Sequence, residues 1–333
     1  MLKLYKKIVE WEFWPFWFFY IPIYFYWFYL GIRARSLMFF SAANPLMEMG
    51  GLANYSKYNV IKQFDAKYLP PTVFLGTEAD KGKALSMLQE AGLDFPLVAK
   101  PDLGERGKGV VKVNNASELE LYLKDSPAPI ILQGFLTEPL EFGVMYYRLP
   151  NEARGSISSV VQKGFLGVVG NGQSSVGQLL AAEQRGKLYV ESIEKRYPEL
   201  IGYVPKLQEY VVVEPIGNHC RGTTFLNANH LINAKLIDTF DDISKNIKGY
   251  YFGRYDLKTE SLEALYEGKI KILELNGANS EPAHIYDPSM KLLSAYRHLF
   301  GHWKRLYRIS VQNHKKGVPY MGLLDGIRLM LKK

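Results

Sequence analysis

The chain has 333 residues, of which 47% are hydrophobic and 22% are charged. This composition excludes a disordered or collagen-like protein, and the length allows either two lobes or one large domain with an ample core. The single cysteine, Cys220, excludes a disulfide framework, and the formal net charge of +8 favours anionic partners such as nucleotides or an acidic membrane surface.

Aromatic residues are concentrated near the N-terminus. Residues 13–32 carry no charge, and most of them are Phe, Trp or Tyr. As one helix the segment would be about 30 Å long, which matches the hydrocarbon thickness of a bilayer. Pro15 and Pro22 would kink it, however, and Trp and Tyr prefer the headgroup region to the bilayer centre. We therefore expect residues 1–36 to form a membrane-associating segment that lies in the interface or enters one leaflet.

Two alternatives stay open for the aromatic segment. It could span the bilayer, or it could pack on the chain's own domain or on a partner in a homodimer. At the other end of the chain, residues 301–333 combine basic residues with leucines, isoleucine and methionine at helical spacing. This pattern predicts a basic amphipathic helix at a membrane surface, with an ordinary docked terminal helix as the alternative.

Between these ends, residues 37–56 are predicted to be a connector and residues 57–300 a catalytic domain of mixed structure. Helices are predicted at residues 78–91, 116–123, 175–185, 187–196 and 289–307. Strands are predicted at residues 96–100, 110–113, 130–133, 142–147, 157–169, 210–214, 230–237, 250–256 and 269–275. Because the strands are grouped, with helices between the groups, the pattern indicates an α+β fold.

A glycine-rich turn follows the strand that ends at Lys100. The segment LVAKPDLGERGKGVV, residues 97–111, places Gly104, Gly107 and Gly109 between two short strands. Glycines allow backbone amides to approach an anion closely, and a lysine adds a point charge. The pattern matches neither the Walker motif nor the dinucleotide fingerprint. It predicts a phosphate-binding loop, with an ordinary hairpin as the alternative.

An acidic cluster is predicted towards the end of the domain. Asp256 lies in YFGRYDLK, and Glu274 and Asn276 lie further along the chain in KILELNG. Glu274 and Asn276 are two apart on a strand, so their side chains project from the same face. Two carboxylates and an amide oxygen suit Mg²⁺, which leaves its other positions to water and nucleotide phosphates. A solvated strand edge is the alternative.

Taken in order, these motifs resemble the ATP-grasp superfamily, in particular the D-alanine–D-alanine-ligase-like carboxylate–amine ligases, over residues 55–290. The resemblance implies two α+β lobes that grip ATP, with Mg²⁺ held by Asp256, Glu274 and Asn276. It also implies a catalytic role for Lys100 and for Arg254, which would stabilise the oxyanion. The residues that it implies for the nucleotide are Lys57, Lys100, Gly104, Gly107 and Gly109 at the phosphates, Gln133, Gly134 and Leu136 at the adenine, and Glu141 at the ribose.

A second loop is similar to one in cyanophycin synthetases. It lies in LGVVGNGQSSVGQLL, residues 166–180, where Asn171 replaces an aspartate of that family's loop and Ser174 and Ser175 replace a Ser/Thr pair. The resemblance places Ser174 near phosphate or the acyl group. The alternative is a polar turn in which Ser175 caps the following helix.

The chain departs from D-alanine–D-alanine ligases before Lys57. Only a short stretch stands where that family has a large domain that helps to bind the first amino acid, which puts D-alanine as the substrate in doubt. The candidates for substrate contacts are polar side chains of the predicted catalytic domain: Arg148, Ser174, His219, Arg221, Ser280, Glu281 and His284.

The resemblance implies that a substrate carboxylate attacks ATP to give an acylphosphate and ADP, and that an amine then displaces phosphate. Because an aromatic segment stands where a soluble substrate domain would be, we expect a membrane-delivered or cell-envelope substrate and a location at the cytoplasmic face of the membrane. A ligase for soluble amino acids or peptides is one alternative. A membrane-tethered, non-catalytic ATP-binding protein is another. Nucleic acid is not expected, because the basic residues flank the terminal segments instead of forming one patch.

Overall fold

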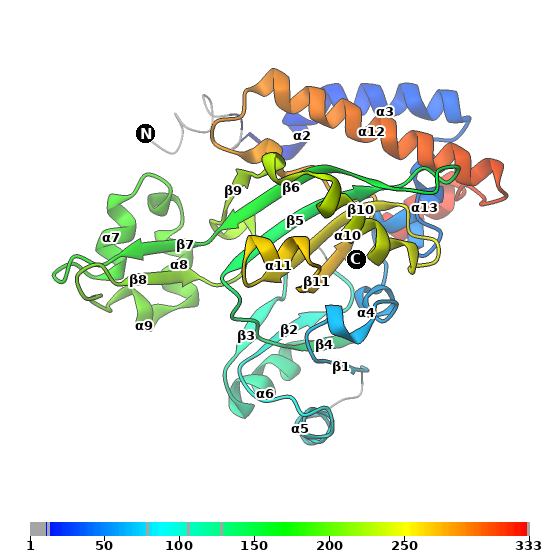
Figure 1. The fold of residues 1–333 in the computed structure, drawn as a ribbon. Helices are drawn as coiled ribbons and strands as arrows, with labels where there is room; N and C mark the ends of the chain where they lie inside the picture. The colour runs from blue at the N-terminus through cyan, green and yellow to red at the C-terminus, as the bar shows by residue number, and fades with distance from the viewer. Residues whose placement is uncertain (1–10, 12–13, 78–79, 105–106, 127–128, 332–333) are drawn as a thin grey trace.

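The computed structural model describes residues 11, 14–77, 80–104, 107–126 and 129–331. This part of the molecule consists of two lobes, each built on a sheet, a small two-stranded subdomain, and a layer of helices from both ends of the chain (Figure 1). The predicted α+β fold class is therefore confirmed. Several residues of the predicted terminal segments, among them 1–10, 12–13 and 332–333, lie outside the described residues.

The small lobe is a four-stranded antiparallel sheet with helices on one face. Its strand order is β1-β4-β2-β3, with β1 (Thr72–Leu75), β2 (Leu97–Pro101), β3 (Val111–Val113) and β4 (Ile130–Gly134). Helices α5 (Lys81–Glu90) and α6 (Ala116–Asp125) bury Leu88 and Leu119 against the strands. The side chains of Asp80 and Asn115 cap these helices by accepting from free backbone amides.

The large lobe is a five-stranded antiparallel sheet. Its order is β11-β10-β5-β6-β9, with β5 (Leu140–Tyr147), β6 (Ser156–Gly164), β9 (Thr224–Asn227), β10 (Phe252–Thr259) and β11 (Ile270–Asn276). Helices α10 (Ala234–Lys245) and α11 (Leu262–Tyr266) cover one face, where Phe240 packs on Tyr255. Because side chains alternate along a strand, Arg254 and Asp256 project from the other face, towards the small lobe.

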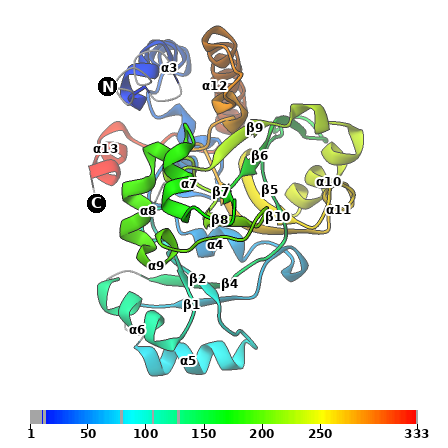
Figure 2. The same ribbon diagram turned by 90° about the vertical axis from the view of Figure 1, so that its left-hand side faces the viewer.

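The two-stranded subdomain projects from the side of the large lobe (Figures 1 and 2). Strands β7 (Leu166–Val169) and β8 (Tyr210–Glu214) pair antiparallel, and α7 (Val176–Ala182), α8 (Val190–Arg196) and α9 (Pro198–Ile201) pack beside them. Ser175 caps α7 in a capping box with Gln178. The capping role, which the sequence left open for Ser175, is thus observed.

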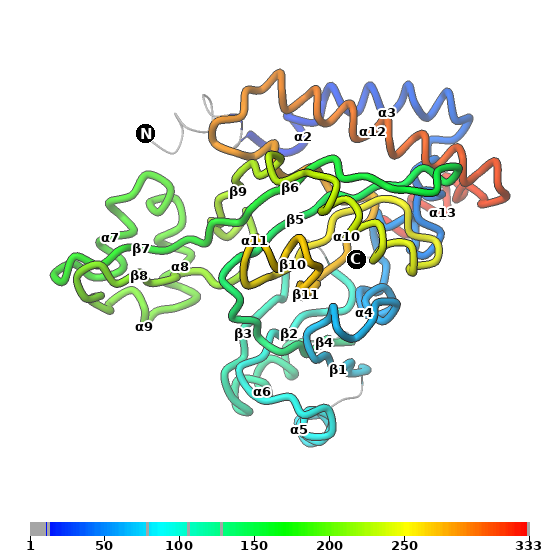
Figure 3. The backbone as a smooth tube through the Cα atoms, in the orientation of Figure 1, coloured from blue at the N-terminus to red at the C-terminus, as the bar shows by residue number. Residues whose placement is uncertain are grey.

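A helical layer joins the two ends of the chain. Helix α2 (Phe16–Phe19) leads into α3 (Ile21–Ala34), which lies beside α12 (Leu292–Lys315), with α13 (Leu323–Leu331) nearby (Figures 1 and 3). The hydroxyl of Tyr296 donates to the carbonyl of Phe19 at 2.9 Å, and the rings of Tyr26 and Phe300 meet at 5.0 Å. The inner face of the aromatic segment therefore packs on helix α12 of the same chain.

No helix among the described residues has both the length and the apolar character that crossing a bilayer requires. The outer face of α2 and α3 nevertheless leaves large side chains exposed, with Trp17 at 64% and Phe25 at 74%.

The prediction of a strand at residues 230–237 is wrong. Asn233 instead caps helix α10, whose side chains Leu236, Phe240 and Ile243 are buried at helical spacing. The predicted strand at 157–169 is two strands, β6 and β7, which belong to different sheets. The long helix predicted at 289–307 is present as α12 and continues to Lys315.

Asn44 fastens the segment before the small lobe to the large sheet. Its side-chain amide donates to the carbonyls of Gly50 and Phe252 at 2.9 and 2.8 Å, and its oxygen accepts from the amides of Tyr251 and Phe252, both at 2.9 Å. The residue is fully buried. The side chain thus makes four hydrogen bonds that water could not replace.

We expect Asn44→Ala to lower the free energy of unfolding by about 3 kcal/mol, because it leaves several buried backbone groups unpaired. Urea denaturation followed by circular dichroism measures the change. Asn151→Ala, at an exposed position, is the matched control and should change stability by less than about 0.5 kcal/mol. Equal stability of the two variants would contradict the role given to Asn44.

Candidate active site

Strands β10 and β11 bring four predicted site residues together. Their antiparallel register pairs Arg254 with Asn276 and Asp256 with Glu274, so all four side chains share the face that looks towards the small lobe. A Cβ on Gly253 would lie 1.9 Å from the carbonyl oxygen of Asn276, so this approach of the strands requires glycine. Two carboxylates that face each other across a strand pair repel unless cations lie close by.

Cations and an amide surround Asp256. Its carboxylate accepts from the guanidinium of Arg254 at 3.2 and 3.1 Å and from the amide of Asn276 at 2.9 Å, and the ammonium of Lys163 lies 3.3 Å away. Burial alone would raise the pKa of Asp256, but Arg254 and Lys163 outweigh burial and lower it. Asp256 is therefore an ionised carboxylate inside the protein.

Lys163 on β6 is a central residue that none of the sequence motifs indicated. Its ammonium lies 2.8 Å from the carboxylate of Glu141, the predicted ribose ligand, and 3.3 Å from that of Asp256. Burial disfavours its charge, yet Asp256 and Glu141 raise its pKa. A signal was available: in the predicted strand segment ISSVVQKGF, residues 157–165, Lys163 shares a strand face with Ser159 and Val161.

Lys100 and Lys57 approach the same strand pair from the small-lobe side. The ammonium of Lys100 donates to Gln133 Oε1 at 2.8 Å and to the carbonyl of Leu273 at 2.9 Å. That of Lys57 donates to the carbonyl of Gly104 and lies 3.8 Å from Glu274. Burial, opposed by Glu274 and reinforced by Lys57, lowers the pKa of Lys100 to about 8. Two cations thus converge beside the predicted metal ligand Glu274.

The glycine-rich loop contacts the two-stranded subdomain. Gly104, Gly107 and Gly109 all have positive φ, and a Cβ on Gly107 would clash with the side chain of Asn218 at 2.5 Å. The guanidinium of Arg221 donates to the carbonyl of Val110 at 3.0 Å and lies 3.7 Å from buried Glu214. Arg221, predicted to contact substrate, therefore ties the loop to the subdomain.

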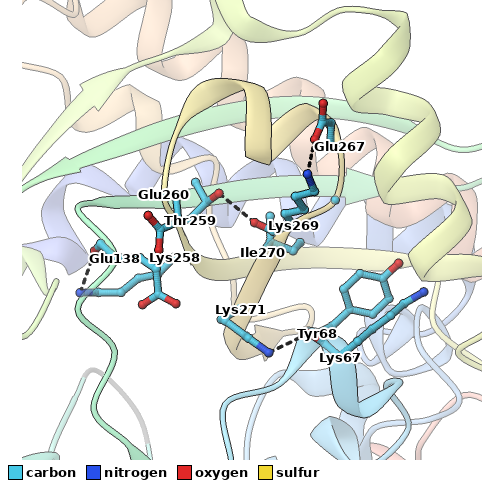
Figure 4. A pocket seen from close by; sticks show the side chains of 11 residues that line it. Lys67, Tyr68, Glu138, Lys258, Thr259, Glu260, Glu267, Lys269, Ile270 and Lys271 are labelled. Carbon is cyan, nitrogen blue, oxygen red and sulfur yellow. Dashed lines mark hydrogen bonds and ion pairs between the residues drawn. The ribbon is translucent and has the colours of Figure 1, made fainter.

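A cavity of about 470 Å³ lies next to the predicted adenine-binding hinge, at the ends of β10 and β11 (Figure 4). Lys258, which lines it, donates to the carbonyls of Leu136 and Glu138 at 3.0 and 3.4 Å. Burial lowers the pKa of Lys258. Gln133, in contrast, is buried in the small lobe, where it also donates to Thr72 at 3.2 Å. The hinge region is therefore contacted by Lys258, a lysine that no sequence motif indicated.

Beyond Asn276 the chain builds a second polar group on the same side of the sheet. The hydroxyl of Tyr286 donates to one carboxylate oxygen of Glu281 at 2.8 Å, and the hydroxyl of Tyr20, from the aromatic segment, donates to the other oxygen. Arg254 donates to the backbone carbonyl of Glu281 at 3.4 Å. Burial raises the pKa of Glu281 to about 7. Glu281 thus connects the N-terminal helices with the strand that carries Asp256.

His284 and Ser280 belong to this second group. His284 Nδ1 lies 2.6 Å from Ser159 Oγ, and its Nε2 is buried without a hydrogen-bond partner in the described part of the chain. Burial and neighbouring His298 lower the pKa of His284 to about 3, so the imidazole is neutral. Ser280 is buried and donates to the carbonyl of Gly277 at 2.5 Å.

Three other predicted substrate residues have different positions. His219 packs its ring 5.4 Å from that of Tyr286, so it borders the second polar group. Arg148 lies after the end of β5, with its guanidinium 5.0 Å from the ring centre of Tyr251. Ser174 lies in the turn between β7 and α7 and accepts from the side-chain amide of Asn171 at 3.1 Å. The structure does not bring Arg148 or Ser174 to the cluster around Asp256.

The chemistry of the donors fits Mg²⁺. Among the described residues, no three His, Cys, Asp or Glu side chains gather as a metal site, so the predicted set depends on two carboxylates and the amide of Asn276. Hard oxygen donors of this kind are those that Mg²⁺ takes while it retains waters or phosphate oxygens. The Glu274 side chain is 29% exposed, so an incoming ligand can reach it.

No protein-family model matches the chain, and no curated protein matches its sequence. Among solved structures it is similar to a D-alanine–D-alanine ligase from Bacillus anthracis, at 14% identity and a TM-score of 0.47, over 81% of this chain and 72% of that one. It is also similar to VanG D-Ala:D-Ser ligase from Enterococcus faecalis, at 15% identity and a TM-score of 0.44, over 76% of this chain and 61% of that one. A third match is a bifunctional glutathione synthetase from Pasteurella multocida, at 16% identity and a TM-score of 0.36, over 74% of this chain and 36% of that one.

All three matches have identities below 25% and TM-scores below 0.5. At such identities and TM-scores they describe a likeness of fold and assign no activity to this chain.

We expect the raised pKa of Glu281 to make stability depend on pH. The folded state binds more protons than the unfolded state between about pH 4.5 and 7, so stability falls as pH rises through this range and levels off above it. Glu281→Gln removes this dependence. The stability of the wild type relative to the variant should therefore fall by about 3 kcal/mol from pH 4.5 to pH 7.5.

Urea denaturation at a series of pH values measures this difference. Glu199→Gln, at an exposed position, is the matched control, and its difference from the wild type should stay nearly constant. A Glu281→Gln curve parallel to that of the wild type would show that Glu281 is ionised in the folded protein.

Proposed function

We propose that the protein is an ATP-dependent carboxylate–amine ligase. The observation that carries this proposal is the convergence of Lys57, Lys100 and Lys163 on the strand pair that holds Asp256, Glu274 and Asn276. Cations from the small-lobe side and from β6 thus meet paired carboxylates at the surface between the two sheets. A triphosphate needs this combination, because its charge must be neutralised by lysines and by a divalent ion.

The proposed roles follow from these positions. Lys57, Lys100 and the loop with Gly104, Gly107 and Gly109 hold the phosphates. Lys163 moves from its carboxylate partners towards the same negative charge. Asp256, Glu274 and Asn276 hold Mg²⁺, which supplies further charge neutralisation at the phosphate oxygens. Glu141 accepts from the ribose, and the hinge at Gln133, Gly134 and Leu136 borders the base.

In the proposed reaction the carboxylate of one substrate attacks the γ-phosphorus of ATP, and ADP leaves. The acylphosphate that results is attacked by an amine, and the tetrahedral intermediate collapses to an amide with loss of phosphate. Arg254 reaches from Asp256 to the carbonyl of Glu281, so it stands between the metal ligands and the second polar group. There it can stabilise the developing oxyanion, a contribution of about 3–4 kcal/mol for one well-placed donor.

The substrates are proposed to meet in the second polar group, around Ser280, Glu281 and His284. The contact from Tyr20 to Glu281 makes the aromatic segment part of this region. Because the outer face of that segment is exposed and apolar, we propose a membrane-delivered or cell-envelope substrate and catalysis at the cytoplasmic face of the membrane. A soluble amino acid or peptide is the alternative substrate class.

One observation favours a second candidate, a non-catalytic ATP-binding protein. The oxygens of Asp256 already have Arg254, Lys163 and Asn276 as partners. If these contacts persisted with nucleotide bound, Asp256 would be unable to hold a metal ion. The two candidates differ in whether acyl transfer accompanies ATP binding.

We expect the affinity for a non-hydrolysable ATP analogue to depend on Mg²⁺ through Glu274. Calorimetric titration should show at least tenfold weaker binding when EDTA replaces Mg²⁺, and Glu274→Gln with Mg²⁺ should match the wild type in EDTA. Lys100→Met should weaken binding about 10- to 100-fold in both conditions, because a buried ammonium is lost. Glu263→Gln, at an exposed position, is the control. Binding that is indifferent to Mg²⁺ and to Glu274→Gln would exclude the metal site.

We expect the acylphosphate to be trapped as a hydroxamate. The wild-type protein, incubated with ATP, Mg²⁺, hydroxylamine and a mixture of cell metabolites and lipids, should form a hydroxamate that mass spectrometry detects. Glu274→Gln should form none, while Glu263→Gln should equal the wild type. A protein that binds the ATP analogue but yields neither hydroxamate nor ADP from soluble or lipid extracts is the non-catalytic candidate.

A further inference from the structure

The outer side of α3 carries a continuous apolar stripe. Its residues recur at steps of three and four, which places them on one face of the helix. All are between 39% and 74% exposed: Ile21, Tyr24, Phe25, Phe28, Tyr29 and Ile32. The opposite face buries Ile23 and Leu30 against α12 and its neighbours. Helix α3 is thus apolar on both faces, and only one of them is covered by the described part of the chain.

The length and composition of the stripe suit the surface of a bilayer. Fourteen residues make a helix of about 21 Å, too short to cross the hydrocarbon core. Tyrosine is enriched where headgroups meet acyl chains, and an apolar helix face held parallel to the membrane enters the same region.

A groove between α3 and α12 lies at the edge of this stripe. It has a volume of about 470 Å³ and is lined by three cations and three tyrosines from the two helices, and none of the described acidic side chains lines it. These residues are Tyr26, Tyr29, Arg33, Lys304, Tyr307 and Arg308. The two helices lie side by side at the opposite end of the molecule from the small lobe (Figures 1 and 2).

The cations of the groove have no acidic partners within the described part of the chain. Arg33 lies 5.8 and 6.0 Å from the ring centres of Tyr29 and Tyr307 and donates to the Tyr29 hydroxyl at 3.4 Å. Lys304 and Arg308 are exposed and four apart on α12, where like charges repel. None of the ion pairs between described residues includes Arg33, Lys304 or Arg308. An anion in the groove would relieve this repulsion and accept from the tyrosine hydroxyls.

We propose that the groove between α3 and α12 binds the phosphate headgroup of an anionic lipid while the outer stripe of α3 lies in the bilayer interface. The charges and the apolar stripe adjoin, which is how a headgroup and its acyl chains adjoin in a membrane surface. The proposal requires no ligase activity. The proposed function includes a membrane-delivered substrate, and this proposal adds that the surface formed by α3 and α12 binds anionic lipid. Binding of the ATP analogue is an independent measure of whether the fold of each variant is intact.

The test is flotation of the full-length protein with two kinds of vesicle, phosphatidylcholine alone and phosphatidylcholine with about 30 mol% phosphatidylglycerol. We expect at least tenfold tighter binding to the anionic vesicles. The triple variant Arg33→Gln, Lys304→Gln, Arg308→Gln should lose about 100-fold in affinity for them, because each cation near an anionic surface contributes about fivefold. The double variant Phe25→Ser, Phe28→Ser should lose binding to both kinds of vesicle.

The matched control is Lys187→Gln, Lys195→Gln, Lys206→Gln, three exposed lysines of the subdomain, which lowers the net charge by the same amount. It should lose less than threefold. Affinity of every variant for the ATP analogue should equal that of the wild type, which shows that the fold is intact and separates this test from that of the ligase.

Three results would overturn the proposal. The first is equal binding to neutral and anionic vesicles. The second is an equal loss of affinity for anionic vesicles in the control triple variant, which would show that binding depends on net charge and not on the groove. The third is absence of vesicle binding. In that case the stripe could be covered by a second copy of the chain, and the Phe25→Ser, Phe28→Ser variant would then dissociate the dimer. Alternatively, the groove could bind only soluble phosphate, which would raise the melting temperature of the wild type but not that of the Arg33→Gln, Lys304→Gln, Arg308→Gln variant.

Discussion

Burial of charge is the constraint on which the site depends. Asp256, Glu141 and Lys163 are 6%, 3% and 9% exposed, and such burial favours their neutral forms. The charges persist because they compensate one another at distances near 3 Å, with Arg254 as the second cation. Such a network tolerates little displacement, since loss of one partner leaves an uncompensated charge in the interior. The positions of β5, β6 and β10 relative to one another are therefore tightly determined.

This arrangement also explains how a polyanion could be accepted without rebuilding the protein. Lys57 and Lys100 use backbone carbonyls of Gly104 and Leu273 as partners, which are weaker acceptors than a phosphate oxygen. Under the proposed function, phosphate oxygens would replace these two carbonyls as the acceptors of the ammonium groups. Electrostatic stabilisation of this preorganised kind acts most strongly where water is excluded, as it is around Lys100.

The sequence predicts local geometry well and long-range contacts poorly. The spacing of Glu274 and Asn276 placed them on one strand face, and the register of β10 and β11 agrees. Residues 210–214 form a strand with the predicted bounds. The strand predicted at residues 230–237 is wrong because apolar residues there suit either a strand or the first turn of a helix. The N-cap at Asn233 favours the helix. The contact from Tyr20 to Glu281 spans 261 residues, and no local pattern encodes such a distance.

The pairing of α3 with α12 has a consequence for biosynthesis. Helices α2 and α3 are synthesised long before their partner α12, since Phe19 and Tyr296, which join the two layers of helix, are separated by 277 positions. Until α12 has been synthesised, the inner face of α3 is as uncovered as its outer face, and contacts this distant in sequence form slowly.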